Sequence, residues 1–123
     1  MAQDESLGLL VIIRCSPYRN SLARASLEVA LTAAAFEQKV NLLFLGDGVL
    51  QLLPDQDSRA VGRKSQERTL ASLPLYDIDQ VYLDADAVAR YGIDPQAAPV
   101  PSLLLDTDQI RQLLHSHERL LPF

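Results

Sequence analysis

The segment that decides the fold is Val40-Asn41-Leu42-Leu43-Phe44-Leu45-Gly46-Asp47-Gly48-Val49-Leu50-Gln51-Leu52-Leu53-Pro54, an apolar run that passes through a glycine turn into a short helical segment. A run of this kind is typical of a strand covered on both faces, as in a parallel sheet. Ligands and partners of open α/β sheets gather at the carboxyl ends of the strands. The turn at 46–48 therefore marks the edge where a functional site is expected.

Length, charge and cysteine content narrow the class of protein. A chain of 123 residues predicts one domain over 1–123 with one sizeable core. The net charge of -5 and the lack of a Lys/Arg cluster disfavour direct binding to nucleic acid. A single cysteine cannot form an internal disulfide, no signal-peptide pattern opens the chain, and no apolar run is long enough to span a membrane. We expect a cytoplasmic protein with no membrane contact.

The rest of the chain alternates strand and helix patterns. The fully apolar run Leu7–Ile13 predicts a central strand, and Asn20 or Ser21 can cap a helix that runs to about Gln38. Val49–Leu53 predicts a short helix ended by Pro54. Further patterns predict a polar connector over 55–63, helices over 64–73, 85–91 and 108–115, strands over 80–83 and 102–105, and an edge strand in the tail 119–123. With right-handed crossovers, this order predicts an α/β three-layer sandwich with a mostly parallel sheet of about five strands.

Cys15 is the first candidate for chemistry because it follows a buried strand, precedes a helix and has Arg14 beside it. Positive charge and a helix amino end both favour a thiolate. The alternative is that Cys15 packs as a small hydrophobe at the end of the strand, as free cysteines often do. No histidine lies near it in sequence, so the residues alone do not establish a Cys/His pair.

Asp84 and Asp86 follow the third strand at the same edge. Phosphoacceptor receiver domains place an aspartate there, but they also need an acidic cluster after the first strand, where this chain has Arg14-Cys15-Ser16. We therefore expect one of the two aspartates to cap the helix that follows.

The remaining polar candidates predict no cofactor and no metal. Gly46-Asp47-Gly48 is too short for a phosphate-binding fingerprint, and two glycines around an aspartate instead permit a tight turn. His115 and His117 are two residues apart at a helix end, so their side chains diverge and are expected to be solvated.

Several apolar residues occur where solvent-exposed positions are expected. A helix that is apolar on every side is normally buried, and a small domain has limited room to cover it. These residues form a candidate interface with a protein partner, or they close the ends of the domain's own core. They are Val49, Leu50, Leu52, Leu53, Leu75, Tyr76, Leu121 and Phe123.

Three blocks of the chain together resemble a known family. They are Phe44-Leu45-Gly46-Asp47-Gly48-Val49-Leu50-Gln51-Leu52-Leu53-Pro54, Leu75-Tyr76-Asp77-Ile78-Asp79-Gln80 and Arg90-Tyr91-Gly92-Ile93-Asp94-Pro95. They are similar to the DsrE/DsrF-like sulfur-relay family, most closely to its TusC (DsrF-type) subunits. The similarity runs from the first strand to the carboxyl terminus, and the Asp-Gly-Val-x-Gln-Leu-Leu-Pro block is fairly specific.

The resemblance implies a non-catalytic subunit of a heterohexamer with two copies each of TusB-, TusC- and TusD-like chains. Such a complex passes persulfide sulfur, with TusA- and TusE-like carriers as indirect partners, toward 2-thiolation of the wobble uridine of certain tRNAs. A dissimilatory sulfur pathway is the other destination that the family allows.

The resemblance also implies that the reactive thiol lies on another chain. In the D-type subunit the sulfur acceptor is a cysteine just after the third strand, and the corresponding stretch here is Leu83-Asp84-Ala85-Asp86, with no thiol. A carboxylate cannot replace a nucleophilic sulfur. Cys15 matches no family motif, so two alternatives stay open from the residues: a small persulfide carrier that uses Cys15, and a homo-oligomeric binding module.

Overall fold

The computed structural model describes residues 8–15, 20–36, 38–52 and 68–123. In these residues it contains one sheet of five strands, in the order β4-β3-β2-β1-β5, and every neighbouring pair is parallel. The predicted five-stranded sheet is confirmed, and the tail forms an edge strand as expected. The strands are β1 Leu9–Ile13, β2 Val40–Phe44, β3 Val81–Asp84, β4 Ser102–Leu105 and β5 Arg119–Pro122.

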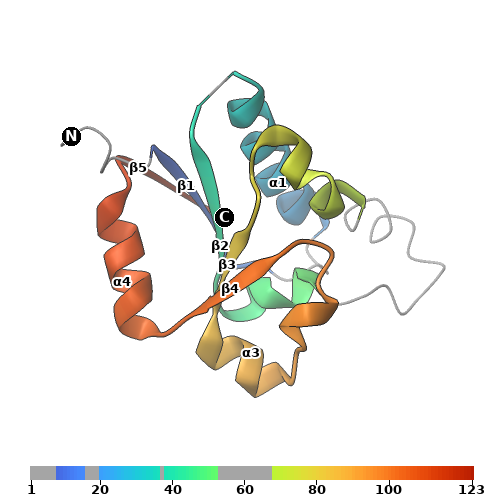
Figure 1. Ribbon diagram of the computed structural model, residues 1–123, viewed down its shortest axis with the longest axis vertical. Coiled ribbons are helices and arrows are strands. Elements are labelled where there is room, and N and C mark those ends of the chain that lie inside the picture. The colour runs from blue at the N-terminus through green and yellow to red at the C-terminus, as the bar shows by residue number, and fades with distance from the viewer. Residues whose placement is uncertain (1–7, 16–19, 37, 53–67) are drawn as a thin grey trace.

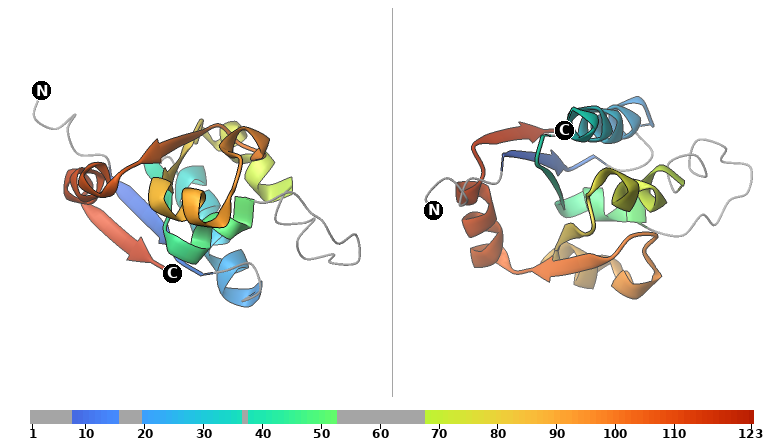
Figure 2. Two further views of the ribbon diagram at one scale, coloured as in Figure 1. Left: turned by 90° about the horizontal axis from the view of Figure 1, so that it is seen from below. Right: turned by 45° about the horizontal axis from the view of Figure 1, so that its top comes forward.

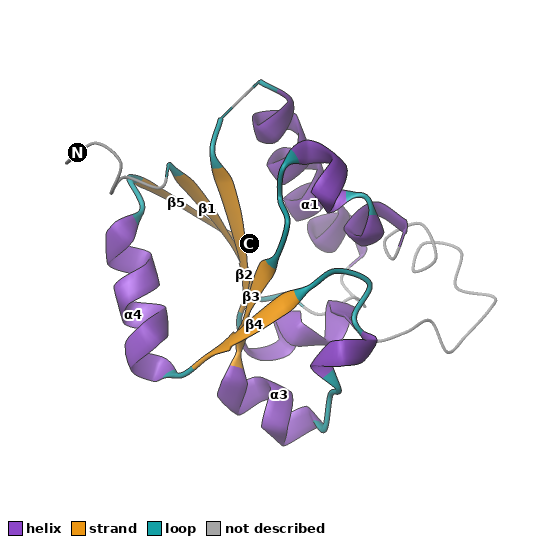
Figure 3. Ribbon diagram, in the orientation of Figure 1, coloured by secondary structure: helices purple, strands orange, loops and turns teal. Residues whose placement is uncertain are grey.

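Helices cover both faces of the sheet (Figures 1 and 3). Figure 1 shows α4 alone on one side and α1 on the other, with α3 near the carboxyl ends of the strands, and Figure 2 shows the same layers from two further directions. Within the described residues, no helix combines the length and the apolar content needed to cross a membrane. The helical elements are α1 Asn20–Ala35, α3 Ala85–Tyr91 and α4 Thr107–Ser116, with 3₁₀ segments η2 Gly46–Leu52, η3 Leu73–Tyr76 and η4 Pro95–Ala97.

The core has two parts because successive residues of a strand point to opposite faces. Val11, Phe44 and Leu83 belong to the larger cluster, which packs against α1, η2, η3 and α3. Leu10 and Leu43 point to the other face and pack with Leu113 of α4. All five residues of β1 are buried, as expected for a strand with neighbours on both sides.

The turn after β2 requires glycine at two positions for different reasons. Gly46 has a φ of +50°, which lies in the left-handed region that favours glycine. Gly48 lies against the end of β1, where a Cβ atom would be only 2.0 Å from the carbonyl oxygen of Ile13. The Gly-Asp-Gly sequence therefore allows η2 to begin directly against the neighbouring strand.

The segment before β3 differs from the predicted helix over 64–73. Residues 68–71 are helical, and the chain then forms η3, in which Pro74 occupies the first turn instead of ending a helix. Proline is accepted there because the first turn needs no amide donor from it. Leu70 and Leu73 are buried, whereas 53–67, including the expected connector, lie outside the described residues.

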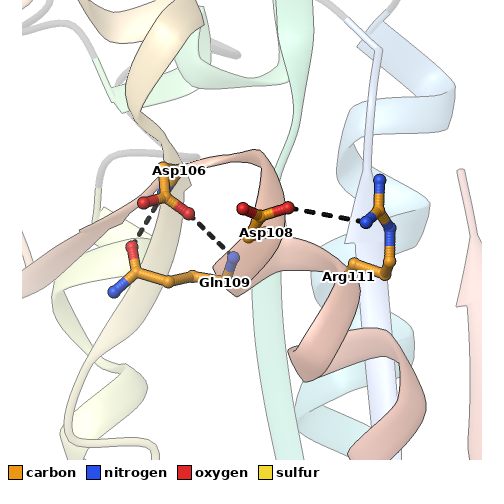
Figure 4. Close-up of polar contacts among 4 residues, drawn as sticks. All are labelled: Asp106, Asp108, Gln109 and Arg111. Carbon is orange, nitrogen blue, oxygen red and sulfur yellow. Dashed lines mark hydrogen bonds and ion pairs between the residues drawn. The ribbon is translucent and has the colours of Figure 1, made fainter.

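Local contacts define the end of α3 and the start of α4. Gly92 ends α3 with a φ of 64°. The Asp106 carboxylate accepts from the Gln109 amide at 2.8 Å, and the Gln109 side chain accepts from the Asp106 amide at 2.9 Å, which forms a capping box at the start of α4 (Figure 4). An exposed ion pair joins Asp108 to Arg111 at 3.5 Å and adds little stability.

The expectation that both histidines are solvated is wrong for His117. His115 is exposed, but His117 is buried at the end of α4. Its Nδ1–H donates to the carbonyl oxygen of Leu113 at 2.8 Å, and its Nε2 accepts from the Asn41 side-chain amide at 3.0 Å. The chain turns back toward β5 directly after α4, and this turn carries His117 against the first residues of β2.

We predict that Gly48→Ala destabilises the protein by about 3 kcal/mol or more, because the obstacle to the new methyl group is backbone that cannot move without breaking the sheet. Gly46→Ala is the matched control. Nothing lies within 4 Å of its added Cβ, so only the strain of its positive φ, about 1–2 kcal/mol, should appear. Urea unfolding of both variants measures the difference. Equal losses would contradict the proposed role of the Gly48 contact.

Candidate functional site

The carboxyl ends of the first three strands bring the sequence candidates to one edge of the sheet. Cys15 follows β1, the η2 turn follows β2, and Asp84 is the last residue of β3. The Leu45 amide donates to the Ile13 carbonyl at 2.9 Å, which continues the pairing of β1 and β2 one residue beyond the strands. Backbone contacts therefore fix the relative positions of these three segments.

Asp84 connects the β2 turn to α3. One carboxylate oxygen accepts from the Gly46 amide at 3.2 Å. The other accepts from the amides of Asp86 and Ala87, at 3.1 and 3.4 Å. Asp84 is thus the helix cap, as predicted for one of the two aspartates, and Asp86 lies exposed in the first turn. The hydrogen bond from the Gly46 amide also fixes the glycine turn beside Asp84. The sequence pattern did not predict this hydrogen bond.

A second contact joins η2 to the end of α3. The Tyr91 hydroxyl donates a hydrogen bond to the Asp47 carboxylate, and both residues are exposed. This hydrogen bond, with a smaller contribution from desolvation, raises the pKa of Tyr91 above its ordinary value. The Arg90 guanidinium lies 5.4 Å from the centre of the Tyr91 ring. The hydrogen bond between Tyr91 and Asp47 therefore links α3 to η2 on the solvent side of the turn.

Cys15 lies inside the edge of the domain. Only 7% of the residue is exposed. The Gln51 side-chain amide donates to the Cys15 carbonyl at 2.9 Å and lies 3.5 Å from Sγ. Burial agrees with the packing interpretation of this cysteine, and buried cysteines are generally inert compared with exposed thiols in electropositive surroundings.

Gln51 is the residue of this edge that sequence reasoning overlooked. It is the single polar side chain in the apolar run Val49–Leu53. A lone polar residue in such a run is the sequence signal that could have identified it. It is buried in η2 and contacts the end of β1. A polar group at such a position needs a partner inside the protein, and Cys15 supplies one.

The candidate interface residues divide into three groups. Val49 and Leu52 are fully buried in the domain's own core. For these two residues the alternative to a partner interface, closure of the domain's own core, is the one observed. Leu50, Leu121 and Phe123 are partly buried and pack on the same cluster. Leu75 is 84% exposed and Tyr76 is also exposed, whereas Leu53 lies outside the described residues.

The polar contacts at the carboxyl ends of the strands stabilise one backbone conformation of this edge. The Asp84 carboxylate binds three backbone amides. Within the described ranges, no group of three or more His, Cys, Asp or Glu side chains could hold a metal ion. The one cysteine of the chain is buried. The observed contacts therefore account for positioning of the β2 turn and α3.

We predict that Asp84→Ala lowers the free energy of unfolding by about 1–2 kcal/mol, because it removes the cap of α3 and the acceptor for Gly46. Asp86→Ala is the matched control, two residues away in an exposed position without a capping bond, and should change stability by less than about 0.5 kcal/mol. Denaturant unfolding of the two variants provides the measurement. A loss in Asp86→Ala as large as that in Asp84→Ala would contradict this account.

The chain is similar in sequence to several known proteins. The chain is 32% identical over 116 residues to a Pseudomonas aeruginosa protein named TusC homolog, covering 94% of this chain and 98% of that protein. It is 36% identical over 113 residues to Protein TusC of Klebsiella pneumoniae, covering 91% and 95%. It is 40% identical over 80 residues to the intracellular sulfur oxidation protein DsrF of Allochromatium vinosum, covering 65% of this chain and 59% of that protein.

The solved structure of the YchN protein from Escherichia coli has the same fold. It superposes with a TM-score of 0.76 and covers 94% of this chain and 98% of that one, at 16% identity. The model of the DsrE/DsrF-like family matches residues 8–123. The resemblance carried by the three sequence blocks is confirmed, and the chain belongs to the DsrE/DsrF-like family.

Proposed function

We propose that this chain is a non-catalytic, TusC-like subunit of a TusBCD-type complex that passes persulfide sulfur toward 2-thiolation of the tRNA wobble uridine. The observation that carries the proposal is the similarity to proteins named TusC over nearly the full length of both chains. The similarity to DsrF covers 65% of this chain. The longer match favours tRNA thiolation over a sulfur oxidation pathway.

The structure at the end of β3 supports the non-catalytic role. This is where the family resemblance implies the acceptor cysteine of a D-type subunit, and here the corresponding stretch is Leu83-Asp84-Ala85-Asp86, with no thiol. In this stretch the two oxygens of Asp84 accept from the amides of Gly46, Asp86 and Ala87. A carboxylate cannot form a persulfide, because that step needs a nucleophilic sulfur. In this proposal the chain supplies contact surface and a neighbour carries the sulfur.

The exposed apolar residues of η3 are the proposed contact surface. Leu75 and Tyr76 are held outward by a short 3₁₀ turn whose first residue, Leu73, is buried in the core. Burying large apolar side chains of this kind is a main source of free energy in subunit association. We propose that a TusB- or TusD-like chain covers them, with the partly buried Leu50, Leu121 and Phe123 as further contacts.

We predict that this chain, co-expressed with TusB- and TusD-like chains of the same organism, elutes with them as one complex whose mass by light scattering fits two copies of each. Leu75→Lys should weaken assembly about tenfold, because it places a charge in an apolar contact. Phe36→Lys is the matched control, since Phe36 is 75% exposed at the end of α1. Separate elution of the three wild-type chains at micromolar concentration would refute the proposal.

We also predict that the sulfur resides on a partner. After exposure of the native complex to a persulfide donor, mass spectrometry of each chain should show the added sulfur atom on the D-type chain and not on this one. Cys15→Ser should leave that transfer unchanged, because the Cys15 thiol is buried. A stable sulfur adduct on Cys15, lost in Cys15→Ser, would instead support the persulfide-carrier alternative.

A further inference from the structure

The two edges of the sheet differ in how they are protected. Natural edge strands are commonly protected from pairing with other chains by charged residues or proline. β5 carries Arg119 and Pro122. β4 reads Ser-Leu-Leu-Leu and contains neither a charge nor a proline. It ends the sheet among the residues that the structure describes.

The backbone of β4 offers hydrogen-bonding groups to a further strand. The Val81 amide donates to the Pro101 carbonyl at 3.0 Å, so the backbone groups of residue 101 point toward β3. Because these groups alternate in direction along a strand, those of Ser102 and Leu104 point away from the sheet. Two N–H groups and two C=O groups are therefore directed outward along this edge.

Side chains next to this edge are apolar on both faces. Leu103 pairs with Tyr82 on the α4 side and is 46% exposed, and Leu104 is 41% exposed on the opposite side. Leu104 and Ser102 also line a groove of about 580 Å³ beside the segment 95–101. A strand added here would place alternate side chains beside Leu103 on one face and in this groove on the other.

The charge around the edge favours a basic partner over a second copy. Residues 77–110 contain seven aspartates and one arginine. Among them Asp79, Asp94 and Asp106 are exposed and lie next to β3, η4 and β4 in the chain. Two copies paired edge to edge would bring these like charges together, whereas lysine or arginine on the incoming strand would neutralise them.

We propose that the free edge of β4 binds an extended segment of a partner chain, apolar at alternating positions and flanked by lysine or arginine, as an added β-strand. Backbone hydrogen bonds from Ser102 and Leu104 hold the segment, and the acidic surroundings select its flanks. The inference needs a partner chain but does not depend on the sulfur-relay assignment, because any segment with this chemistry meets the same edge.

The test uses the full isotope-labelled chain and two synthetic peptides of alternating valine and threonine, one flanked by lysines and one by glutamates. Titration with the lysine-flanked peptide should shift the amide resonances of Ser102 and Leu104 more than those of β5. The glutamate-flanked peptide should bind at least about tenfold more weakly. Because no relay protein is present, this result is independent of the co-expression experiment.

The decisive variant is Leu104→Pro, which removes an outward N–H that β3 does not use and should weaken peptide binding about tenfold. Leu120→Pro is its matched control. The Arg119 amide donates to the Gly8 carbonyl at 3.1 Å, so the Leu120 amide also points outward, and Leu120 is 45% exposed on the β5 edge. Leu104→Lys provides a second variant if the proline variant does not fold, because its charge repels the basic flanks.

Loss of binding in Leu104→Pro or Leu104→Lys, with binding kept in Leu120→Pro, supports the proposal. Equal binding by the two peptides, shifts confined to β5, or no shift at millimolar peptide would overturn it. A wild-type chain that dimerises alone by light scattering, and becomes monomeric in Leu104→Pro, would overturn the basic partner in favour of a second copy.

Discussion

The close approach of the β2 turn to the end of β1 is the constraint on which the functional edge depends. Gly48 lies so near the Ile13 carbonyl that a side chain cannot be accommodated, and the Leu45 amide bonds to the same oxygen. This contact directs η2 under the ends of the strands, where Gln51 reaches the Cys15 backbone and Gly46 reaches Asp84. The contacts that hold Cys15 and α3 follow from that placement.

At this edge of the sheet, polar side chains form hydrogen bonds with other groups of the same chain. The Asp84 carboxylate caps α3 and holds the glycine turn, and the Asp47 carboxylate accepts from Tyr91 on the solvent side. In a relay subunit of the proposed kind, such an edge gives neighbouring chains a constant shape. The exposed residues available for contact then lie elsewhere, on η3 and along β4.

Local sequence patterns were sufficient to predict the strands, most helices and their caps. Apolar runs mark buried strands, Gly92 marks a left-handed cap, and Asp84 and Asp106 precede helices in a way that depends on neighbouring residues only. The patterns failed where distant segments decide the outcome. His117 is buried because β2 places Asn41 beside it, and Val49 and Leu52 are covered by elements far away in sequence. The contacts of Gln51 and Tyr91 required the assembled fold for the same reason.

The position of β5 has a consequence for how the chain is made. β1 pairs with β2 on one side and with β5 on the other, so its second edge is completed by residues 119–122. A ribosome synthesises β1 early and β5 more than a hundred residues later. During that interval an apolar strand has one open side, and contacts between such distant segments also form slowly. Nascent chains of this protein are therefore candidates for chaperone protection until β5 has been synthesised and can pair with β1.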